Sequence, residues 1–110
     1  MSDSFEKREK GEETKYSLDQ ELVFKVDARR NKLLGLWLAV EFGFKDDAAA
    51  DYAKEVVVAD LNEPGIDDVV SKVMNDILGR SAKISEEQVR AKIAEFQEIA
   101  TDQVRNEFPS

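Results

Sequence analysis

The sequence predicts an all-α protein, a small four-helix bundle in one domain, and three observations support this. Apolar residues recur every three or four positions through most of the chain. The one strand-like run, Val56-Val57-Val58, lies inside such a helical pattern. Helix start and stop signals divide the chain into four segments, and 110 residues suffice for one domain with its own core.

The first predicted helix covers residues 18–43. Ser17 and Gln20 have the spacing of a capping box, and Gly43 marks the end. Arg29 or Arg30 interrupts the apolar stripe of this helix. We expect the stripe to face the core; it consists of Leu18, Leu22, Val26, Leu33, Trp37 and Val40.

The second half of this helix is apolar on more than one side, because Leu34, Leu36 and Leu38 add to the stripe. Other helices should therefore surround it. Gly35 would allow one of them to approach closely, and Trp37 is expected to be buried.

The other three helices are predicted at 47–61, 67–78 and 86–106. Asp46 or Asp47 caps the first of them, Gly79 is the expected C-cap of the second, and Ser85 with Gln88 forms a capping box before the third. Their inward-facing residues are predicted to be Ala49, Ala53 and Val56 or Val57, then Val69 or Val70, Val73 and Ile77, then Val89, Ile93, Phe96, Ala100 and Val104.

Composition excludes several classes of function. A net charge of −8 argues against nucleic acid as a partner. The chain has no cysteine and no histidine, so thiolate metal sites and the usual general base are missing, and we expect no enzyme activity, no catalytic residues and no metal site. The longest apolar run, residues 33–44, is too short for a membrane span, which needs about 20 residues. We expect no direct membrane insertion and a cytoplasmic location.

Residues 1–16, here called the N-terminal arm, differ from the rest of the chain. Beyond the initiator they hold only two large apolar residues, Phe5 and Tyr16, too few to offset the entropy of ordering. Acid-before-base pairs such as Asp3–Lys7 nevertheless favour a helix. We therefore expect a mobile arm that is coded as a helix but lacks a core to hold it, in front of a bundle at 17–110.

Two segments carry a resemblance to a known family. "ELVFKVDARRNKLLGLWLAVEFG" and "YAKEVVVADLNEPGIDDVVSKV" resemble the zeta subunit of alphaproteobacterial F-type ATP synthases. The most specific parts are "ARRNKLLGLW" (28–37) and the Glu-Pro-Gly followed by Asp-Asp-Val (63–69), in the right order and at the right separation. The resemblance spans nearly the whole chain.

The resemblance implies a function, a partner and a location. Such proteins are inhibitors of ATP hydrolysis, in which a four-helix body supports an arm that enters the catalytic head (alpha, beta and gamma subunits) beside the rotor. This chain would then be peripheral to the inner membrane through the synthase, and monomeric. The partner-binding residues implied for the arm and its continuation are Phe5, Arg8, Glu9, Lys15, Tyr16, Leu18 and Leu22.

Two alternatives accompany this interpretation. One is a helical binding or assembly module of the same complex that does not inhibit. The other is weak adenine-nucleotide binding by the bundle, suggested by the resemblance alone; otherwise no cofactor is expected. The chain also departs from the family at Glu12, where an aromatic residue often follows the "EKG" element.

The basic residues Arg29, Arg30 and Lys32 allow two interpretations. They lie next to the apolar section of the first helix. The arginines are either solvated or paired with acidic residues of neighbouring helices, or else this basic section makes a secondary contact with acidic groups of the catalytic head.

Overall fold

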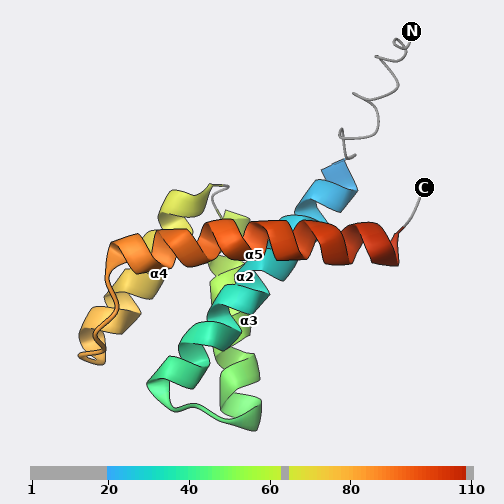
Figure 1. The fold of residues 1–110 in the computed structure, drawn as a ribbon. Coiled ribbons are helices and arrows are strands. Elements are labelled where there is room, and N and C mark those ends of the chain that lie inside the picture. Colours follow the sequence, from blue (N-terminus) through green and yellow to red (C-terminus); the bar gives the residue numbers. More distant parts are fainter. Residues whose placement is uncertain (1–19, 63–64, 109–110) are drawn as a thin grey trace, which may run out of the picture.

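The protein consists of four helices in a computed structural model, which describes residues 20–62 and 65–108. The helices, labelled as in Figure 1, are α2 (Gln20–Phe42), α3 (Asp46–Asn62), α4 (Ile66–Gly79) and α5 (Glu86–Glu107). No strand occurs within these residues, so the all-α prediction is confirmed. The last three helices differ from their predicted ranges by at most one residue at each end. Ser17, half of the first predicted capping box, lies outside the described residues.

Helix α2 is the centre of the arrangement. It forms a hairpin with α3 and contacts α5, whereas α4 packs on α3 and α5. Figure 1 shows that α5 lies across α2 instead of running alongside it. Because α2 is covered by α3 and by α5, it has buried residues along most of its length.

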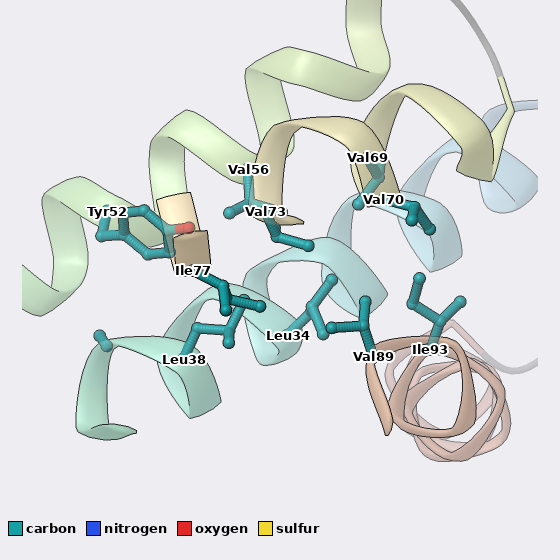
Figure 2. Close-up of a cluster of buried hydrophobic side chains, with 11 residues drawn as sticks. Leu34, Leu38, Tyr52, Val56, Val69, Val70, Val73, Ile77, Val89 and Ile93 are labelled. Carbon is teal, nitrogen blue, oxygen red and sulfur yellow. The ribbon is translucent and has the colours of Figure 1, made fainter. Parts of the chain in front are cut away.

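The main core is formed by side chains from all four helices, which meet between α2 and the α3–α4 pair (Figure 2). Burying each Val, Leu or Ile contributes about 1.5–3 kcal/mol. A second, smaller cluster joins the first half of α2 to the end of α5 through Val26, Ala100 and Val104. The members of the main core include Leu34, Leu38, Tyr52, Val56, Val69, Val70, Val73, Ile77, Val89 and Ile93.

The buried face of α2 differs from the predicted stripe. Val26 is buried as expected, but the face continues through Leu34 and Leu38, and Val40 is 72% exposed. Trp37 is only half-buried, with Lys92 Nζ 5.4 Å from its ring centroid, so the prediction that it is buried was wrong. The predicted stripe and the buried face both contain apolar residues at helical spacing, so periodicity alone does not show which of them is buried. The contacts of α2 with α3 and α5 decide this.

Gly35 confirms the expected close approach of a second helix. A Cβ atom at this position would lie 2.6 Å from the Ala53 Cα atom of α3. Contact with a backbone atom leaves no room for adjustment by a side-chain rotation. The absence of a side chain at Gly35 therefore sets the separation of α2 and α3.

The ends of the helices follow the predicted signals at two places. At the start of α5, Gln88 N–H donates to Ser85 Oγ at 3.1 Å and Ser85 N–H donates to Gln88 Oε1 at 2.8 Å, the predicted capping box. At the end of α2, Gly43 adopts a positive φ of 83°. Its N–H donates to Val40 O and the next N–H donates to Ala39 O, which is a Schellman motif.

Gly79 was predicted to be the C-cap of α4, but the structure places the cap one residue later. Gly79 is still helical, the C-cap is Arg80, and the positive φ (58°) occurs at Ser81. The Arg80 guanidinium lies 4.5 Å from the ring centroid of Phe44 and 5.2 Å from that of Phe42. This tertiary contact stabilises the cap, and a local glycine signal could not indicate it.

Candidate functional site

Most residues predicted for the arm interface precede the described part of the chain. Phe5, Arg8, Glu9, Lys15, Tyr16 and Leu18 lie outside the described residues, so their part in partner binding stays a prediction. Leu22 is described: it is half-buried and packs against the small cluster of Val26, Ala100 and Val104. The first turn of α2 is thereby fixed to the end of α5.

Arg29 joins α2 to the end of α5. It donates to both carboxylate oxygens of Glu107, at 2.7 and 2.9 Å, and to Gln103 Oε1 at 2.8 Å. This two-point pairing is the geometry that a guanidinium makes with a carboxylate. The hydrogen bond raises the pKa of Arg29 and lowers the pKa of Glu107.

Arg30 replaces an aliphatic residue on the buried face of α2, and only 6% of it is exposed. Its guanidinium donates to Gln97 of α5 at 2.9 Å and to Asn31 Oδ1 at 3.0 Å. It also lies 3.5 Å from carboxylate oxygens of Asp27 and of Asp60 in α3. Arg30 therefore links α2, α3 and α5 through polar contacts.

The predicted intramolecular pairing of Arg29 and Arg30 is thus what the structure contains. Lys32 differs from both because it is exposed. It borders a shallow hollow between α2, α3 and the end of α5, together with Lys25 and Phe108. The secondary contact of Arg29, Arg30 and Lys32 with a catalytic head stays a prediction, and Lys32 is the one whose side chain is most open to it.

A cavity of about 150 Å³ lies between α2 and α3, and none of the residues that line it was predicted as a site residue. Asn31 is fully buried, although it follows two arginines. Asp60 is the acidic partner of Arg30 from α3. The cavity is lined by Phe24, Asp27, Ala28, Asn31, Val57, Asp60 and Leu61.

Burial and the neighbouring charges shift the pKa of Asp27. Burial raises the pKa of Asp27, Arg30 opposes that shift, and the negative charge of Asp60 adds to it. One sequence signal for Asn31 exists: it precedes Leu34 by three positions and Leu38 by seven, which places it on their face. Nothing in the sequence connects Asp60 with Arg30 before the helices are packed.

The described residues offer little for other chemistry. Within 20–62 and 65–108, no group of three or more acidic side chains could hold a metal ion. Over the same ranges, no helix has the length and apolar character needed to cross a membrane. Adenine-nucleotide binding stays a prediction.

The comparisons with known proteins connect this arrangement to one family. The model of "ATPase inhibitor subunit zeta" matches residues 1–103, which is nearly the whole chain. A structure solved by solution NMR is 45% identical, with a TM-score of 0.67; the match covers 77% of this chain and 96% of that chain. No curated protein matches the chain.

The match and the fold agree with the resemblance carried by the two sequence segments. The family match includes the N-terminal arm, the whole of α2 to α4 and most of α5. The solved structure has a similar fold, and its sequence identity of 45% indicates a related protein. The chain therefore belongs to the ATPase inhibitor subunit zeta family.

Proposed function

We propose that this protein inhibits ATP hydrolysis by an F-type ATP synthase, and that its N-terminal arm (residues 1–16) is the inhibitory element. The family of ATPase inhibitor subunits to which it belongs is the observation that carries the proposal. The arm enters the catalytic head, between the alpha, beta and gamma subunits, and becomes a helix there. It then blocks rotation in the direction of hydrolysis. The protein is cytoplasmic and peripheral to the inner membrane through this complex.

The composition of the arm supports this division of roles. Phe5 and Tyr16 are its only large apolar residues after the initiator, and they would be the anchors of a helix that binds in a groove. The charge pairs of the arm favour the helix but cannot hold it without a partner. Arg8, Glu9 and Lys15 would supply polar contacts around these anchors.

The bundle supports the arm and does no chemistry in this proposal. Leu22 packs on the cluster beneath the first turn of α2, and Arg29 ties the same part of α2 to Glu107. A rigid support reduces the entropy lost when an attached segment binds, because fewer parts must be ordered. The support would therefore increase the affinity of the arm without contacting the rotor.

Deletion of residues 2–16 tests the proposal in assays of ATP hydrolysis by the cognate enzyme. The shortened protein should keep its helical circular dichroism and lose inhibition, because no described core residue is removed. Full inhibition by the shortened protein would contradict the arm mechanism. It would favour the alternative, a module that docks through its bundle.

Substitution of Glu12 provides a second test with the opposite expected sign. Glu12→Phe places an aromatic residue between Phe5 and Tyr16 and should strengthen inhibition. The same change at Glu98, which is exposed on α5, is the matched control and should leave inhibition unchanged. Equal effects of the two substitutions would mean that added apolar surface, not its place in the arm, is responsible.

A further inference from the structure

Two polar atoms in the cavity between α2 and α3 have no hydrogen-bond partner in the described part of the chain. They are Asn31 Nδ2, a donor, and Asp60 Oδ1, an acceptor. Asn31 is fully buried, and the side chain of Asp60 is 13% exposed. Because native proteins leave few buried polar groups unpaired, such atoms call for a partner, which can be a water, an ion or a bound molecule.

The same cavity has an excess of negative charge. Asp27 and Asp60 share one cation, Arg30, and each closest nitrogen-to-oxygen distance is 3.5 Å. The shorter bonds of Arg30 go to the neutral groups of Asn31 and Gln97. Two carboxylates beside one guanidinium leave a charge of about −1 with a buried oxygen still free to accept. A second cationic donor would complement both features.

The walls of the cavity are apolar and partly open. Phe24 of α2 is 54% exposed and Leu61 of α3 is 51% exposed, and Ala28 and Val57 also line the cavity. An apolar cleft with a few polar groups at its base is the usual form of a binding site. A long aliphatic stem that ends in a planar cation fits these walls, because guanidinium groups stack on aromatic rings such as that of Phe24.

From these observations we infer that the cavity between α2 and α3 binds an arginine side chain presented by the catalytic head. The guanidinium pairs with the carboxylates of Asp60 and Asp27, and the stem packs on Phe24 and Leu61. Asn31 Nδ2 and Asp60 Oδ1 are buried in the free protein, so binding requires the side chains at the opening to move aside. Asn31 Nδ2 then donates to a backbone carbonyl of the same segment. A peptide carries both the donor and the acceptor that the cavity lacks. A free cation would leave Asn31 unpaired.

The position of the cavity agrees with this partner. Phe24 lies one helical turn from Gln20, where the described chain begins after the N-terminal arm. An arm bound in the catalytic head would bring this end of the bundle to the same surface. The identity of the partner rests on the proposed function, whereas the preference of the cavity for an arginine peptide does not.

A titration of the full chain with Nα-acetylarginine N-methylamide tests that preference directly. The expected result is a shift of the Asn31 side-chain amide resonances and of the Ala28 backbone amide in ¹H–¹⁵N spectra. The citrulline analogue, which has the same shape without the charge, should bind about tenfold more weakly, because charge-assisted hydrogen bonds are about twice as strong as neutral ones. Equal binding of both peptides, or shifts that leave Asn31 unchanged, would overturn the inference.

Two substitutions in the cavity and one outside it complete this test. Asp60→Asn should weaken binding of the arginine peptide by about tenfold. Phe24→Ala removes an exposed ring, so the fold is retained, and should weaken binding several-fold. Asp102→Asn, at an exposed position on α5, is the matched control. Unchanged binding by both cavity variants would contradict the inference.

Hydrolysis assays separate this inference from the proposed function. If the wild-type protein inhibits the cognate enzyme, Asp60→Asn and Phe24→Ala should raise the half-inhibitory concentration by about tenfold, whereas Asp102→Asn should not. Unchanged inhibition by both cavity variants would refute the docking site but not the arm mechanism. If the wild-type protein does not inhibit, the proposed function fails, and the peptide titration alone decides about the cavity.

Discussion

Replacing Gly35 by alanine should destabilise the protein even though alanine is the better helix former. The new Cβ would lie 2.6 Å from Ala53 Cα and 3.2 Å from both Ala53 Cβ and Val56 Cγ2. Since the nearest of these is a backbone atom, α3 would have to move away from α2. That movement would loosen the main core, in which Val56 is fully buried.

The size of the effect follows from two opposing contributions. Forcing extra volume into a packed core costs about 1–3 kcal/mol. Replacing a helical glycine by alanine gains up to about 1 kcal/mol. Because a backbone contact places Gly35→Ala at the upper end of the first range, we expect a net loss of about 1–2 kcal/mol in the free energy of unfolding.

Urea unfolding followed by circular dichroism measures this loss, and Gly79→Ala is its matched control. A Cβ at Gly79 would meet no atom within 4 Å, and the position is helical, so that variant should be as stable as the wild type or slightly more stable. If Gly35→Ala were as stable as Gly79→Ala, the argument that Gly35 sets the distance between α2 and α3 would be refuted.

Three further results are expected. Arg30→Met should cost about 3 kcal/mol in urea unfolding, since it leaves Asp60 without a counter-ion in a largely buried place; a loss below about 1 kcal/mol would contradict this. Trp37→Ala should cost about 1–3 kcal/mol, less than a fully buried tryptophan, and a larger loss would place its ring in the core. The pKa of Glu107, measured by NMR titration, should lie below that of an ordinary glutamate, so the Glu107–Arg29 pair stabilises the fold above the ordinary pKa and this stabilisation is lost as the pH falls through the lowered pKa. Arg29→Gln should return the pKa of Glu107 towards its usual range. An unchanged pKa in that variant would rule out Arg29 as the cause.

The candidate site was only partly predictable from the sequence. The residue types of the arm and the resemblance of two segments indicated a candidate site, and the family match confirms the resemblance. The role of the arm residues stays a prediction. The structural role of Arg30 remained open because its partners, Gln97 and Asp60, lie 67 and 30 positions away along the chain. Asn31 and Asp60 were missed for the same reason, since a cavity exists only once two helices pack.

Local signals in the sequence determined the helices, because capping and apolar periodicity act over three or four residues. The Ser85–Gln88 capping box, the end of α2 at Gly43 and the close approach at Gly35 were all predicted. Only the tertiary structure decided which side of α2 is buried, because two apolar series share that helix and contacts with α3 and α5 choose between them. It also placed Arg80 at the cap of α4 by stacking on Phe42 and Phe44, a contact between residues distant in sequence that no local pattern contains.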